Sequence, residues 1–126
     1  MTAASILVVD DDEAFRHAVC RTLRAAGHAV EETDGGHALR VLDGEAPDLL
    51  ITDLIMPDHD GIELILAVKR TWPAVKILAM SGRRVGGVSL LNMAGRLGAD
   101  GTLDKPFSND ELLATVAALV GSAPTA

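Results

Sequence analysis

The sequence predicts an α/β fold in which a doubly wound parallel sheet is covered by helices on both faces. Short β-branched apolar runs alternate five times with stretches of helical spacing along the 126 residues. Near-continuous apolar strands of this kind are typical of parallel sheets buried on both faces. Right-handed crossovers limit their topology to a few arrangements. The length fits one compact domain, so we expect residues 1–126 to form a single domain.

Apolar runs and chain breakers define the expected elements. Strands are expected at residues 6–9, 29–33, 49–52, 75–80 and 101–103, and helices at 14–26, 62–70, about 88–97 and a final stretch ending near 120. A capping box of Ser108 and Glu111 opens that last helix, and Asp34 is expected to cap a helix through residues 38–42. Residues 56–61 and the glycine-rich residues 82–87 predict loops, and residues 121–126 a tail or linker stub.

Composition excludes several classes of protein. The formal net charge of −7 argues against direct nucleic-acid binding, which needs clustered Lys and Arg. Cys20 is the only cysteine, so no internal disulfide can form, and its apolar helical setting predicts burial. The first residues show no signal-peptide pattern, and no apolar run approaches the ~20 residues that span a bilayer. We therefore expect a cytoplasmic protein with no membrane segment.

Polar residues follow the ends of four expected strands. Asp10 and Asp11 follow the first strand, Asp53 the third and Ser81 the fourth, while Lys105 comes shortly after the fifth. Ligands of doubly wound sheets bind outside the carboxyl ends of the strands, so these side chains are expected to converge. Each residue alone is unremarkable, since an acid in such a place often only caps a helix. Their convergence on one edge indicates a functional site.

Crowded carboxylates at this edge predict a divalent cation. Packed together they would repel one another and hold protons, and Mg²⁺ suits such a site because it prefers oxygen ligands and retains waters or phosphate oxygens. Asp53 stands alone at its strand end and is the natural nucleophile, since carboxylates form acyl phosphates. Ser81 and Lys105 could supply a hydrogen bond and a fixed cation to phosphoryl oxygens.

Five short motifs occur in order along nearly the whole chain. They are Ile6-Leu-Val-Val-Asp-Asp11, Asp53-Leu-Ile-Met-Pro57 with Asp60-Gly61, Met80-Ser81-Gly82, Gly98-Ala-Asp100 and Lys105-Pro-Phe107. With these five motifs in this order, the sequence resembles a bacterial two-component response-regulator receiver domain of the CheY-like type. The resemblance implies a flavodoxin-like three-layer sandwich, with five strands ordered 2-1-3-4-5 and flanked by five helices.

The resemblance also implies a function in phosphorelay signalling. Asp53 would become 4-aspartylphosphate, taking its phosphoryl group from a sensor histidine kinase or a histidine phosphotransfer protein. The domain would then act on an unknown downstream protein through protein–protein contacts. It would not be an enzyme beyond its own Mg²⁺-dependent phosphorylation and dephosphorylation at Asp53.

By the same match, individual positions receive roles. The implied Mg²⁺ ligands are Asp10, Asp11, Asp53 and the backbone carbonyl of Ile55. Ser81 and Lys105 would contact the phosphoryl group, and the bond before Pro106 is expected to be cis. Thr102 stands where the family commonly has Tyr or Phe, whose ring reports phosphorylation. The signal is therefore expected to leave through residues 82–97 instead.

Two alternative functions and several single residues stay open. A Mg²⁺-dependent phosphatase with an Asp nucleophile would carry a second acid where this chain has Ile55. A flavodoxin-like cofactor carrier would need phosphate-binding donors, rather than acids, after the first strand. Arg83 and Arg84 are either solvated or contact phosphate or a partner, and Met93 either packs in the core or marks a docking patch. Surface positions without a metal-ligand role are expected for His17, His28, His37 and His59.

Overall fold

The computed structural model describes residues 4–56, 60–82, 84–85, 88–89 and 91–120. The strands are β1 (Ser5–Val9), β2 (Ala29–Thr33), β3 (Leu49–Asp53), β4 (Lys76–Ser81), β5 (Arg84–Val85), β6 (Val88–Ser89) and β7 (Gly101–Asp104). The helices are α1 (Glu13–Ala25), α2 (Ala38–Gly44), α3 (Gly61–Thr71), α4 (Leu91–Leu97) and α5 (Asn109–Val120).

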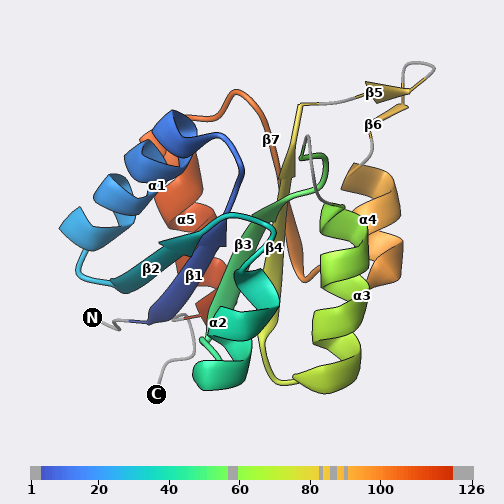
Figure 1. Ribbon diagram of the computed structural model, residues 1–126. Coiled ribbons are helices and arrows are strands. Elements are labelled where there is room, and N and C mark those ends of the chain that lie inside the picture. Colours follow the sequence, from blue (N-terminus) through green and yellow to red (C-terminus); the bar gives the residue numbers. More distant parts are fainter. Residues whose placement is uncertain (1–3, 57–59, 83, 86–87, 90, 121–126) are drawn as a thin grey trace.

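Five strands form one parallel sheet in the order β2-β1-β3-β4-β7, which confirms the predicted doubly wound topology. Figure 1 shows α1 and α5 on one face of the sheet and α2, α3 and α4 on the other. None of the helices in the described part of the chain is long and apolar enough to cross a membrane.

The strands separate two aliphatic cores. Leu7 and Val9 of β1 face the core under α2, α3 and α4, while Ile6 and Val8 face the core under α1 and α5. Every residue of β3 is buried, as expected of a central strand covered on both sides. Cys20 is buried as predicted, and this burial raises the pKa of its thiol to about 11.

Local capping explains where two of the helices begin. Asp12 caps α1, since its side chain accepts a hydrogen bond from the backbone N–H of Phe15. The predicted capping box is confirmed: Glu111 accepts from the N–H of Ser108, and Ser108 accepts from the N–H of Glu111, both at 3.0 Å.

The cap predicted for the second helix was wrong. Asp34 accepts from the N–H of His37 and pairs with that imidazole at 2.8 Å, but α2 begins only at Ala38 and has His37 as its N-cap. The Asp34 side chain accepts from the N–H three residues on, as an N-cap would, but residues 35–37 form a turn. Asp34 therefore closes a turn ahead of the helix rather than the helix itself.

The segment after β4 also differs from expectation. Residues 82–87 were predicted to be a loop and 88–97 a helix, whereas β5 and β6 pair as an antiparallel hairpin and α4 begins at Leu91. Val85 pairs with Val88 across two glycines, and two glycines between β-branched residues are a hairpin signal. The side chains of Arg83 and Arg84, the tip of the predicted loop 56–61 at residues 57–59, and the tail 121–126 lie outside the described residues.

The expected surface placement of the histidines holds for two of them. His17 and His37 are exposed. His28 is half-buried, because its Nδ1 accepts a hydrogen bond of 3.1 Å from the N–H of Ala4. His59 lies outside the described residues. Met93 is exposed on α4, while Ala94 beside it is buried.

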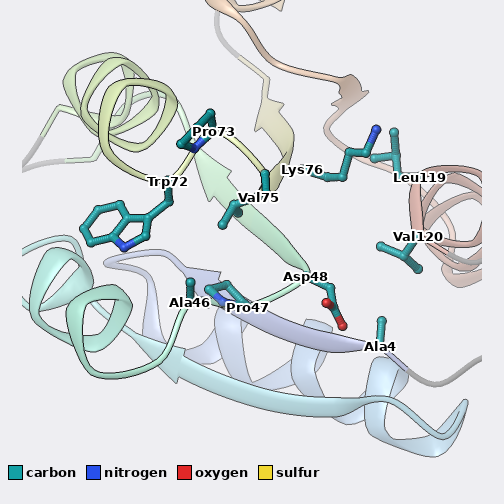
Figure 2. Close-up of a pocket in the computed structure, with 11 residues that line it drawn as sticks. Ala4, Ala46, Pro47, Asp48, Trp72, Pro73, Val75, Lys76, Leu119 and Val120 are labelled. Carbon is teal, nitrogen blue, oxygen red and sulfur yellow. The ribbon is translucent and has the colours of Figure 1, made fainter.

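A hollow of about 570 Å³ opens at the amino ends of the strands. Among its lining residues, Ala4 directly precedes β1, Asp48 directly precedes β3 and Lys76 begins β4. Trp72 and Val120 lie at its two sides (Figure 2). The hollow is therefore at the edge opposite to the polar residues that the sequence singled out.

Gly61 fixes the close approach of α3 to the end of β3. Its N–H donates to the carbonyl of Leu54 at 3.0 Å. A Cβ atom here would overlap the carbonyl oxygen of Asp53 and lie 2.8 Å from the Cα of Leu54. Backbone atoms cannot move aside as a flexible side chain can, so this position requires glycine.

We expect Gly61→Ala to lower the free energy of unfolding by about 3 kcal/mol, because the added methyl group displaces α3 from the sheet. Gly95→Ala is the matched control: a Cβ atom there meets nothing within 4 Å. Alanine within α4 should stabilise by about 0.5–1 kcal/mol. Urea unfolding measures both, and equal midpoints for Gly61→Ala and the unchanged protein would contradict this account.

Candidate functional site

Four of the predicted site residues meet at the carboxyl edge of the sheet. Asp10 directly follows β1, Asp53 ends β3, Ser81 ends β4 and Lys105 directly follows β7. The parallel register makes these ends level, since Asp53 pairs with Met80 and Ser81 with Asp104. Asp10, Asp53 and Ser81 are 3%, 8% and 1% exposed, so this is a largely desolvated polar cluster.

The ammonium of Lys105 holds the cluster together. Its Nζ lies 2.6 Å from Oδ2 of Asp53 and 3.5 Å from Oδ2 of Asp10. The backbone N–H of Lys105 donates to the carbonyl of Ser81 at 3.1 Å, which fixes where the side chain begins. The bond between Lys105 and Pro106 is cis, as predicted.

The carboxyl of Asp10 has a raised pKa. Burial raises the pKa of its carboxyl above the ordinary value of 3.8, and the neighbouring charge of Asp53 adds to the rise. The N–H of Asp12, which donates to Oδ1 at 2.9 Å, and the ammonium of Lys105 oppose it. Among the described residues of the cluster, two buried carboxylates thus share one ammonium.

Asp11 points elsewhere. Its Oδ1 accepts a hydrogen bond of 2.9 Å from the N–H of Gly35, and so holds the connection between β2 and α2. Within the described ranges, no group of three or more His, Cys, Asp or Glu is close enough to hold a metal ion. The four-ligand magnesium site therefore stays a prediction.

The donors that do meet fit a hard divalent cation in kind. Asp10 and Asp53 offer carboxylate oxygens with an excess of negative charge, and oxygen is the ligand that Mg²⁺ prefers. Ile55 donates its N–H to Oδ1 of Asp53 at 3.1 Å, so its backbone is already tied to this carboxylate.

The contacts of Arg16 were not predicted from the sequence. Nη1 of Arg16 donates to the backbone carbonyl of Asp10 at 2.7 Å, and Nε donates to Glu32 at 3.0 Å. Glu32 on β2 also contacts His17 and Arg24. Nothing in the spacing pairs residues 16 and 32, because the contact depends on how α1 crosses β1 and β2.

Phe15 lies within the helix expected at residues 14–26, and the sequence assigned it no role in the site. Instead, the Nζ of Lys105 lies over its ring, 4.1 Å from the centroid. Phe107 meets the Phe15 ring edge to face, with centroids 5.9 Å apart. The motif Lys105-Pro-Phe107 places one aromatic near the cation, but it contains no signal for the second.

Thr102 is exposed in the middle of β7, while the next residue, Leu103, is buried. A short, solvated side chain there cannot act as the inward-moving ring that the resemblance describes. The predicted signal path through residues 82–97 runs mostly through side chains outside the described residues, so it stays a prediction.

A family model for the response regulator receiver domain matches residues 6–117. The chain belongs to the response regulator receiver-domain family. Among curated relatives of this receiver domain is the DNA-binding transcriptional regulator NtrC of Azospirillum brasilense, 40% identical over 92% of this chain and 24% of that protein. The response regulator MprA of Mycobacterium ulcerans is 39% identical over 91% of this chain and 49% of that protein. The chain thus spans a quarter to a half of these relatives.

Solved receiver structures agree with this fold. The receiver domain of NtrX from Brucella abortus superposes with a TM-score of 0.86 at 29% identity, covering 94% of this chain and 99% of that one. The chemotaxis protein CheY4 of Vibrio cholerae gives a TM-score of 0.83 at 31% identity, over 94% of this chain and all of that one (100%).

The Arg16–Glu32 contact predicts a pH-dependent stability. Although partial burial opposes it, hydrogen bonds from Arg16 and His17 lower the pKa of Glu32 below its ordinary value of 4.5. The native state therefore binds fewer protons than the unfolded state, and this stabilisation is complete above pH 4.5 and lost as the pH falls through the native pKa.

We expect Glu32→Gln to lower the free energy of unfolding at pH 7 by about 1–2 kcal/mol, since charge-assisted hydrogen bonds are lost. The difference in free energy of unfolding between Glu32→Gln and the unchanged protein should shrink below pH 4.5. Glu45→Gln, at the exposed C-cap of α2, is the matched control and should show neither effect. Urea unfolding across this pH range measures the difference, and a deficit that does not depend on pH would contradict the assignment.

Proposed function

We propose that this receiver domain takes a phosphoryl group onto Asp53. The observation that carries the proposal is the contact between Oδ2 of Asp53 and the ammonium of Lys105, at 2.6 Å, on a desolvated sheet edge. Asp53 is the less buried of the two carboxylates, at 8% exposed, and the ammonium of Lys105 beside it is a fixed positive charge that would favour phosphoryl oxygens.

The transfer is a displacement at phosphorus. A carboxylate oxygen of Asp53 forms the new bond to phosphorus, and the bond to the leaving group breaks with its electron pair. With acetyl phosphate the leaving group is acetate; with a phosphohistidine it is the imidazole nitrogen. Lys105 already lies beside the acceptor oxygen and would follow the negative charge onto the phosphoryl oxygens, with Ser81 at the end of the neighbouring strand as a second contact.

A bound Mg²⁺ would offset the negative charge that two carboxylates and a phosphoryl group bring together. Asp10 and Asp53 would hold it from their present places, with Asp11 and the backbone carbonyl of Ile55 as the further proposed ligands. The burial of Asp10, which raises the pKa of its carboxyl, supports this part of the proposal, because a bound cation would favour the charged form.

The proposed partners follow from the family. Phosphoryl donors would be a sensor histidine kinase or a histidine phosphotransfer protein, and the output would be contact with a downstream protein. The domain itself would not bind nucleic acid, would act in the cytoplasm, and would catalyse only its own phosphorylation and dephosphorylation. The net charge of −7 supports the exclusion of nucleic acid.

Asp53→Asn should abolish labelling by acetyl phosphate with Mg²⁺, because the amide oxygen is a poor nucleophile. Intact-protein mass spectrometry measures the gain of one phosphoryl group. Asp104→Asn is the matched control, since Asp104 is an exposed acid at the end of β7, two strands from β3 in the sheet. It should label as the unchanged protein does, and persistent labelling of Asp53→Asn would refute the assignment.

Asp10→Asn should stabilise the protein in the presence of EDTA, since it removes a buried charge beside Asp53. We expect the thermal midpoint to rise by roughly 3 °C and to rise less on addition of Mg²⁺ than in the unchanged protein. Asp12→Asn keeps a helix cap, and its thermal midpoint should rise on addition of Mg²⁺ by as much as that of the unchanged protein. Equal responses in all three proteins, measured by thermal unfolding, would argue against Asp10 as a metal ligand.

A further inference from the structure

Lys105 has a third partner besides the two carboxylates. Its Nζ lies 4.1 Å from the ring centroid of Phe15, above the face of the ring. The face of an aromatic ring is its negative side, so it attracts a cation held there. The ammonium therefore lies between one neutral attractive surface and two charged acceptors, Asp10 and Asp53.

The Phe15 ring is itself held in place. The N–H of Phe15 donates to Asp12 in the first turn of α1, and the ring is half-buried. Phe107 packs against it at an interplanar angle of 78°, the edge-to-face arrangement that aromatic pairs prefer. Phe107 follows Lys105 by two residues. The segment that carries the ammonium therefore also carries the ring that packs against Phe15.

A ring differs from a carboxylate in ways that matter for the proposed transfer. It cannot take the proton of the ammonium, it does not ligate an oxygen-seeking cation, and it does not repel a phosphoryl group. Were Asp53 to form an acyl phosphate and Asp10 to hold a divalent cation, both carboxylates would change partners. The Phe15 ring takes part in neither change, so it would remain available to the ammonium.

We propose that Phe15 is a positioning residue for Lys105: the face of its ring holds the ammonium beside Asp53, so that its charge meets the incoming phosphoryl group. This inference rests on the proposed phosphorylation of Asp53. The competing account is packing alone, in which the ring only covers the aliphatic stem of Lys105. The two accounts differ in whether the electrons of the ring matter or only its shape.

The kinetic test replaces Phe15 with mono-, di- and trifluorophenylalanine, introduced at this one codon. Fluorine weakens the negative face step by step at nearly constant shape, and cyclohexylalanine removes it entirely. The rate of labelling of Asp53 by acetyl phosphate with Mg²⁺ should fall along the series, reaching a loss of about two- to five-fold. The same analogues at position 107 are the matched control and should give no such gradient.

Conventional variants check the result. Phe15→Leu should lose a similar factor in rate and Phe15→Tyr should restore it, while urea midpoints show that both remain folded. A packing role predicts instead that Phe15→Leu and cyclohexylalanine label at the rate of the unchanged protein.

The spectroscopic test needs neither phosphate nor metal. The chain has three lysines, so lysine labelled with ¹³C at Cε gives few NMR signals. The ε-methylene protons of Lys105 should lie upfield of those of Lys69 and Lys76 because of the ring current of Phe15, and Phe15→Leu should abolish the difference.

The outcomes separate this inference from the proposed function. An unchanged protein that is not labelled at Asp53 would overturn both. The role of Phe15 alone would be overturned if Asp53 is labelled normally but the labelling rate does not change along the fluorinated series. The same holds if the chemical shifts of Lys105 do not change in Phe15→Leu.

Discussion

Two carboxylates, Asp10 and Asp53, are buried at one edge of the sheet with a single ammonium between them, and the rest of the site depends on this arrangement. Without the ammonium, both carboxylates would be buried without a counter-ion, and an unpaired buried charge of this kind typically costs about 3–5 kcal/mol. The position of Lys105 is therefore under strong constraint. The strand ends must be level and the backbone of Lys105 must dock on Ser81. α3 must also approach the end of β3 so closely that only Gly61 fits. The architecture serves to hold mutually repulsive groups within reach of one cation.

Support for this arrangement reaches well beyond the carboxyl edge. Arg16 anchors the backbone carbonyl of Asp10 from α1 and is itself fixed by Glu32 on the outer strand β2. Asp11 holds the connection from β2 to α2 through Gly35. The two adjacent acids thus divide their tasks, since Asp10 belongs to the polar cluster and Asp11 to its surroundings.

The sequence was most informative where one physical signal dominates. Buried strands are continuous apolar runs, so the bounds of β3 were predicted to within one residue. The bounds of β2, an outer strand with no buried residue, were predicted to the residue from a weaker pattern. Topology then brought the polar strand ends together. Prediction failed where two local signals compete, as at Asp34, which can cap a helix or close a turn, and at residues 84–89, where glycines fit both a loop and a hairpin. The directions of side chains were not predictable either, because the contacts of Arg16 and Phe15 depend on the angle at which α1 packs.

The hollow at the amino edge of the sheet has a practical consequence. Ala4 and Val120, near the two ends of the described chain, both line it, on the side of the sheet remote from Asp53 (Figures 1 and 2). A tether attached next to Ala4 or Val120 thus enters the fold at the opposite end of the strands from Asp53. The domain is accordingly suited to oriented immobilisation on a sensor chip or to force spectroscopy, with the edge that carries Asp53 turned toward the solution.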